Sequence, residues 1–66
     1  MTQEELEEEI YEFLKKQQGS VMLGEMINKF HKKLDEIKGL SIDKALKSLH
    51  EQKKIILKEK VSAKVV

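Results

Sequence analysis

A short apolar run at residues 20–23, Ser-Val-Met-Leu, constrains the fold more than any other feature of this sequence. The run is typical of a strand, yet it lies between two stretches with helical periodicity. Four residues cannot form a stable strand alone, because their backbone N–H and C=O groups need partners on a neighbouring strand. The other strand-like pattern is at the end of the chain. The sequence therefore predicts a small sheet that joins residues 20–23 to the C-terminal segment.

Three segments show the 3.6-residue period of amphipathic helices. The first, residues 3–18, begins with a capping box formed by Thr2 and Glu5. The second is predicted over residues 24–38, and the third over residues 41–52 with Ser41 as its N-cap. The apolar stripes are Leu6, Ile10, Phe13 and Leu14 in the first helix, Leu23, Met26, Ile27, Phe30, Leu34 and Ile37 in the second, and Ile42, Ala45, Leu46 and Leu49 in the third. Gly19 and Gly39 are expected to end the first two helices in the left-handed conformation.

The C-terminal segment predicts a β-hairpin. Residues 54–58 and 61–66 alternate apolar and polar side chains, and the charged residues Lys58, Glu59 and Lys60 lie at the turn between them. The order of elements is then helix, short strand, helix, helix and hairpin.

This order resembles that of winged helix-turn-helix domains, over nearly the whole chain. The matching segments are GSVMLGEMINKF, SIDKALKSLHEQ and KIILKEKVSAKVV. The resemblance implies an α+β fold in a single domain, residues 1–66, in which the short strand pairs with the hairpin, called the wing. The chain has Lys53 where many such domains have Gly, so the end of the third helix is expected to differ in shape. The long second helix resembles that of LOTUS-type winged helices, which implies RNA or protein partners.

Several function classes are excluded or disfavoured by what the sequence lacks. The 66 residues contain no Cys, which excludes disulfides and Cys-based zinc sites. His31 and Asp35 are spaced i, i+4, but no third metal ligand accompanies them, and no Ser has a recognisable catalytic base. We therefore expect no enzyme, no metal and no cofactor. There is no apolar run long enough for a membrane span and no signal-peptide pattern, so a cytoplasmic location is expected.

Charge is distributed unevenly along the chain. Residues 1–14 carry six Glu and no Lys, whereas residues 15–66 carry 13 Lys against six acidic residues. This asymmetry predicts an acidic first helix and a basic surface elsewhere. The two sets of charges could instead attract each other within the fold, and the sequence leaves that alternative open.

The basic residues give the candidate nucleic-acid site. The third helix of this fold is the usual reader of the major groove. The candidates are Lys44, Lys47 and Ser48 on the third helix, Lys54, Lys58 and Lys60 on the wing, and Lys29, Lys32 and Lys33 on the second helix. Since Arg is absent, bidentate recognition of guanine is weakened and low sequence specificity is expected.

Two functions fit these observations. The first is binding of nucleic acid, with double-stranded DNA as the main expectation, in a transcription-regulator or accessory role. The second is a protein-interaction or RNA-associated module without affinity for duplex DNA. In that case the acidic first helix would receive a basic protein surface or a second copy of the chain. Interruption of the basic face by Asp43, Glu51 and Glu59 would favour the second function.

Overall fold

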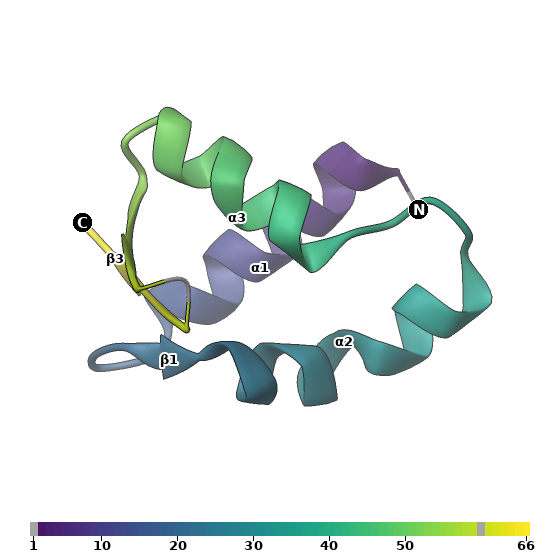
Figure 1. Ribbon diagram of the computed structural model, residues 1–66, viewed down its shortest axis with the longest axis horizontal. Coiled ribbons are helices and arrows are strands. Elements are labelled where there is room, and N and C mark those ends of the chain that lie inside the picture. The colour runs from purple at the N-terminus through teal and green to yellow at the C-terminus, as the bar shows by residue number, and fades with distance from the viewer. Residues whose placement is uncertain (1, 60) are drawn as a thin grey trace.

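The computed structural model describes residues 2–59 and 61–66, and it confirms the α+β winged-helix architecture (Figure 1). The helices are α1 (Gln3–Lys15), α2 (Leu23–Glu36) and α3 (Ile42–Glu51), and the strands are β1 (Val21–Met22), β2 (Ile55–Lys58) and β3 (Ser62–Val65). In the view of Figure 1, α3 lies above α1 and α2 lies below it, with the sheet at the left end of the helices. No helix of the described residues is long and apolar enough to cross a membrane.

The short strand finds its partner in the wing, as the sequence predicts. The sheet has the order β1-β3-β2, and both neighbouring pairs are antiparallel. Val21 lies opposite Ala63 on β3, which in turn lies opposite Leu57 on β2. A further hydrogen bond of 2.7 Å from Leu23 N to Val61 O ties the start of α2 to the wing. The sheet therefore fixes the hairpin relative to the helices.

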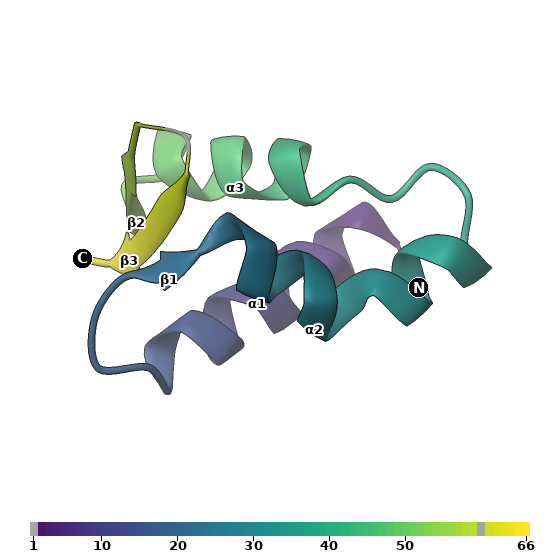
Figure 2. The same ribbon diagram turned by 60° about the horizontal axis from the view of Figure 1, so that its bottom comes forward.

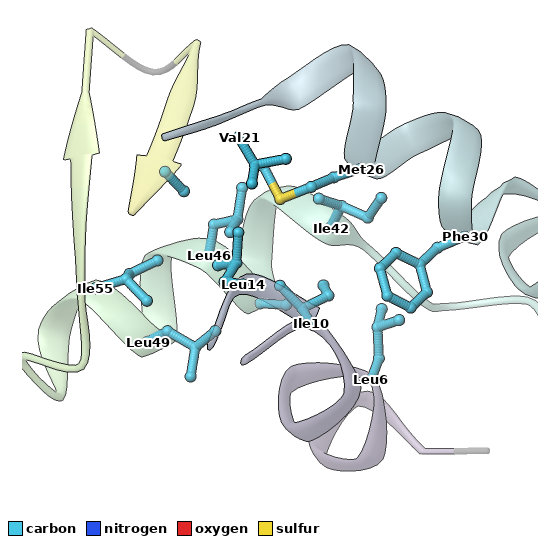
Figure 3. Packing of buried hydrophobic residues seen from close by; sticks show 12 residues of the cluster. Leu6, Ile10, Leu14, Val21, Met26, Phe30, Ile42, Leu46, Leu49 and Ile55 are labelled. Atoms are coloured by element: carbon cyan, nitrogen blue, oxygen red, sulfur yellow. The ribbon is translucent and has the colours of Figure 1, made fainter. Parts of the chain in front are cut away.

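The core lies between the three helices and the inner face of the sheet (Figure 3). Figure 3 shows side chains of α1, α2 and α3 pointing toward one another, with Val21 and Ile55 closing the end near the sheet. The buried apolar residues are Leu6, Ile10, Leu14, Val21, Met26, Phe30, Ile42, Ala45, Leu46, Leu49, Ile55 and Ala63. They agree with the predicted stripes of α1 and α3, apart from Phe13, which is partly buried.

Helix α2 packs most of its predicted stripe against the core, with Leu23 and Leu34 partly buried beside Met26 and Phe30, but it is turned so that one edge of the stripe faces outward. Met26 and Phe30 are its buried residues, whereas Ile27, a predicted core residue, is 44% exposed. Residues 26, 30 and 33 follow one face at spacings of four and three, and Ile27 lies one residue, or about 100°, away from that face. This rotation brings Lys29 and Lys33 beside the buried stripe, and it decides which basic residues of α2 face α1.

The helices end near their predicted positions. Helix α1 stops at Lys15 rather than at residue 18, because Lys16 N and Gln17 N bond to carbonyls three residues back and tighten the last turn. Helix α2 stops at Glu36 rather than at residue 38. Gly19 has φ of 150° and Gly39 has φ of 91°, which is the region that favours glycine. Neither residue caps its helix as expected, because the C-caps of α1 and α2 are Lys16 and Ile37.

The end of α3 corrects an expectation. Lys53 has φ of 62°, so this Lys takes the left-handed conformation that Gly takes in many winged helices. Lys53 N donates to His50 O and Lys54 N donates to Leu49 O, both at 3.0 Å, which is the Schellman pattern. The end of α3 therefore has the usual shape, and the hydrogen bonds hold Lys53 in a strained backbone conformation.

Candidate nucleic-acid interface

Helix α3 is held in place at its N-terminus by two separate contacts. The Ser41 side chain accepts from Lys44 N at 3.3 Å and caps the helix. The Gln3 side chain of α1 then bonds to both backbone groups of Ser41, through Nε2 to the carbonyl at 2.8 Å and through Oε1 to the N–H at 3.0 Å. These contacts and the buried residues of α3 fix which of its side chains face outward.

The outer face of α3 carries Lys44 and Lys47, and both are exposed. Ser48, the third candidate on α3, is partly buried, and its Oγ accepts a hydrogen bond of 3.0 Å from Gln52 Nε2. Gln52 also approaches Glu7 of α1 at 3.4 Å, so Ser48 lies on the flank of α3 that turns toward α1. Lys44 and Lys47 therefore form the accessible basic pair of this helix.

Lys58 is the wing candidate nearest the turn whose position is described. Lys58 is exposed at the end of β2, next to the turn. Its carbonyl accepts a hydrogen bond of 3.1 Å from Val61 N, and Glu59 inside the turn has φ of 53°. The candidate Lys60 lies outside the described residues.

A groove of about 430 Å³ separates α3 from β2. Its lining residues are Asp43, Leu46, Lys47, His50, Leu57 and Glu59. Two carboxylates therefore lie between the basic pair of α3 and the wing. The positive face that runs from α3 to the wing is interrupted, which is the condition that favours a protein partner over DNA.

The basic residues that contact α1 form a second group. Lys33 makes an ion pair with Glu9, and the Lys29 ammonium lies 5.7 Å from the ring centroid of Phe13. Lys54, at the start of the wing, lies 5.4 Å from the ring centroid of Tyr11 on α1. These three candidates are thus placed against the acidic helix rather than beside Lys44 and Lys47. Lys32 is exposed on α2.

The charge asymmetry along the sequence is in part neutralised within the fold. A groove of about 440 Å³ runs between α1 and α2, and it is lined by Glu5, Glu8, Glu9, Glu12, Phe13, Lys16, Lys29 and Phe30. Phe13 and Phe30 meet edge to face in it, with ring centroids 6.0 Å apart. The predictions made from the sequence do not place Lys29 and Lys33 over this aromatic pair. The sequence feature that could have indicated it is the helical spacing of these lysines around Phe30.

The two histidines have local structural partners. His31 Nδ1 contacts the carbonyl of Asn28 at 2.8 Å, within its own helix, and His50 Nδ1 donates to the Ile55 carbonyl at 3.3 Å. Over residues 2–59 and 61–66 there is no cluster of three or more His, Asp or Glu side chains that could hold a metal ion. His50 is exposed and lines the groove beside β2, a position that follows only from the tertiary structure.

Comparison with known proteins supports the fold. No curated protein and no solved structure matches this chain significantly. A family model, the TBPIP/Hop2 winged helix domain, matches residues 5–61, which include α1 from its third residue onward, α2, α3, β1 and β2. Because the match spans well over half of the sequence, the chain belongs to the TBPIP/Hop2 winged helix domain family.

Proposed function

We propose that this winged-helix domain binds double-stranded DNA weakly and with low sequence specificity, as a non-catalytic regulator or accessory module. The observation that carries the proposal is the accessible basic pair on α3, Lys44 and Lys47, together with Lys58 on the wing. The ion pairs among the described residues involve Lys15 and Lys33, so they leave these three ammonium groups open to phosphates. If the major groove of a duplex lies over α3, the phosphate backbone of the duplex lies beside the wing.

The proposal has a quantitative form. Each phosphate contact contributes about −0.9 to the slope of log affinity against log salt. Three contacts from Lys44, Lys47 and Lys58 give a slope of about −2.7, and binding of this kind has a Kd of about 10⁻⁴ to 10⁻⁵ M at physiological salt. Lys presents a mobile point charge rather than a planar fork, which is the reason for low selectivity among sequences.

The test is an amide chemical-shift titration with random-sequence duplex DNA at low salt. We expect shifts at residues 41–48 and 58–61, and loss of most of the affinity in the K44A/K47A double variant. K16A is the matched control, because Lys16 is an exposed Lys at the end of α1, on the groove shared with α2. Affinity that does not change with salt, or shifts spread equally over α1, would contradict the proposal.

A protein-docking function is the second candidate, and a specific observation favours it. Asp43 and Glu59 line the groove between α3 and β2, where a bound duplex would bring phosphates. Carboxylates repel phosphate but attract basic peptide side chains. A titration in which duplex DNA causes no shifts at all would leave protein docking as the better account of this family member.

A further inference from the structure

Strand β2 is an edge of the sheet, and Leu57 on this strand presents its backbone groups to the outside. In an antiparallel ladder, residues alternate between pairs that exchange hydrogen bonds and pairs that do not. Val66 N donates to Lys54 O at 3.1 Å, so alternation along the hairpin assigns Ile56 to a bonded pair and Leu57 to a non-bonded pair. The N–H and C=O of Leu57 therefore point away from β3.

The β1–β3 pairing leads to the same assignment. Leu23 N donates to Val61 O, so the alternate pair Val21–Ala63 is the next that exchanges hydrogen bonds. Ala63 thus uses its backbone groups toward β1 and has none left for Leu57. Two independent ladders place the Leu57 N–H and C=O on the open edge of the sheet.

This open edge lies beside α3, because the His50 side chain of α3 contacts the Ile55 carbonyl on it and the groove between the two elements is lined by Leu57. Figure 2 shows the hairpin next to one end of α3, with β2 on the outer side of the sheet away from β1. Leu46 of α3 and Leu57 of β2 both line the groove and supply its apolar part.

The two ends of the groove differ. Near the end of α3, the His50 Nδ1 donates to the Ile55 carbonyl, so the side chain already occupies the edge of β2 there. At the other end, Asp43 lies in the first turn of α3 and Glu59 lies in the wing turn. No ion pair of either carboxylate occurs among residues 2–59 and 61–66. The groove is thus closed by a histidine at one end and acidic at the other.

We propose that this groove binds an extended peptide segment of a partner protein, which adds to β2 as an antiparallel fourth strand. The central residue of the segment is apolar and exchanges backbone hydrogen bonds with Leu57 while its side chain contacts Leu46. A Lys or Arg two residues earlier lies on the same side of the added strand and meets Asp43 and Glu59. Strand addition of this type takes its affinity from the backbone and its specificity from alternate side chains.

The proposal is independent of DNA binding. A duplex would approach the outward ammonium groups of Lys44 and Lys47, whereas the peptide binds beside them, against the edge of β2. Since Lys47 borders both surfaces, a bound peptide and a bound duplex would compete. Because the peptide contacts the edge of β2 and needs none of the DNA contacts, the peptide site can exist whether or not the domain binds DNA.

The test uses a capped pentapeptide with the sequence lysine, threonine, valine, threonine, threonine, titrated into the ¹⁵N-labelled domain. We expect saturable shifts centred on the Leu57 amide. Replacing the peptide lysine by glutamate should weaken binding about fivefold or more, as loss of an exposed charge pair does. Failure of the Leu57 amide to shift at millimolar peptide would overturn the proposal.

Backbone methylation separates strand addition from other modes of binding. N-methylation of the central valine removes the N–H that donates to the Leu57 carbonyl, so binding should be lost. N-methylation of the threonine that follows the valine is the control, because its N–H points away from β2 and binding should persist. Equal affinity of both methylated peptides would rule out strand addition.

Variants of the domain test the acidic end. The D43N/E59Q double variant should bind the lysine peptide about fivefold more weakly and should no longer discriminate against the glutamate peptide. E51Q is the matched control, since Glu51 is exposed on α3 but does not line the groove. Unchanged discrimination in D43N/E59Q would show that these carboxylates do not select the peptide. Because all three side chains are exposed, circular dichroism can check that each variant remains folded.

Discussion

The lysines on two sides of this domain, the side formed by α1 and α2 and the outer face of α3, differ in whether their charges are engaged within the fold. Where α2 packs against α1, Lys33 pairs with Glu9 and Lys29 lies over the ring of Phe13, so these positive charges are engaged within the fold. On the outer face of α3, Lys44 and Lys47 are exposed and take no part in the ion pairs of the described residues. Counting charges along the sequence therefore overstates the basic surface that a ligand could use.

The different surroundings of the lysines follow from how much each side of the domain contributes to stability. The side of α1 and α2 contains an aromatic pair and an ion pair around buried side chains, so its lysines lie over apolar groups with their ammonium groups near carboxylates. The outer face of α3 contributes nothing to the core, so its residues are free to serve a ligand. Variants on the two sides should consequently separate stability from binding.

The largest effect is expected from F30A. Phe30 is 4% exposed and meets Phe13 edge to face, so the truncation removes core contacts and leaves a cavity between α1 and α2. Such changes cost about 3–5 kcal/mol, a large share of the stability of a small domain. Urea unfolding followed by circular dichroism measures the loss. I27A on the exposed face of the same helix is the control and should change stability by less than about 0.5 kcal/mol.

The K44E/K47E double variant should affect binding and not folding. Two phosphate contacts become two repulsions, so duplex affinity at low salt should fall at least about tenfold. The K29E/K33E variant carries the same change of charge on the other side. It should retain affinity within about threefold, while it loses stability because its new carboxylates face Glu9 and the rings of α1. If both variants lost the same affinity, the contrast between the two sides would be wrong for DNA.

The sequence was sufficient to predict the order of elements and the partner of the short strand. The capping residues Thr2 and Ser41 and the apolar spacing of α1 and α3 are local signals, and the structure agrees with them. The pairing of the short strand with the C-terminal hairpin was also accessible, because a short strand must find its hydrogen bonds somewhere in the chain. The register that places Val21 opposite Ala63 follows only from the structure.

The division of the lysines between the two sides could not be predicted. The apolar stripe of α2 is broad, and both Met26 and Ile27 fit it, so the rotation of the helix depends on packing against α1 and not on local periodicity. That rotation determines where Lys29 and Lys33 point. The groove between α3 and β2 could not be predicted either, since Asp43 and Glu59, which are far apart in the sequence, line it together only in the folded chain.

The K53G variant should stabilise the domain by about 1 kcal/mol. Lys53 holds a left-handed conformation that costs an L-residue about 1–2 kcal/mol, and glycine removes this strain at the cost of some entropy in the unfolded chain. Thermal unfolding measures the gain. The control K64G removes the same charge from the extended backbone of β3, and it should destabilise by about 0.5–1 kcal/mol. A loss of stability in K53G would mean that the Lys53 side chain contributes more than the strain costs.

The smallest effect is expected at the ion pair between Glu9 and Lys33. Both side chains are partly exposed, so a double-mutant cycle with E9Q and K33M should give a coupling of less than about 1 kcal/mol, and high salt should reduce it. The ion pair tests whether the Lys33 ammonium group is engaged within the fold or is available to DNA. E9Q releases the ammonium group without moving it to the outer face of α3. Duplex affinity should therefore stay within about twofold, which fluorescence anisotropy can measure. A clear gain in affinity would show that Lys33, without its ion pair to Glu9, contacts the bound duplex. The side of α1 and α2 and the outer face of α3 would then belong to one DNA-binding surface.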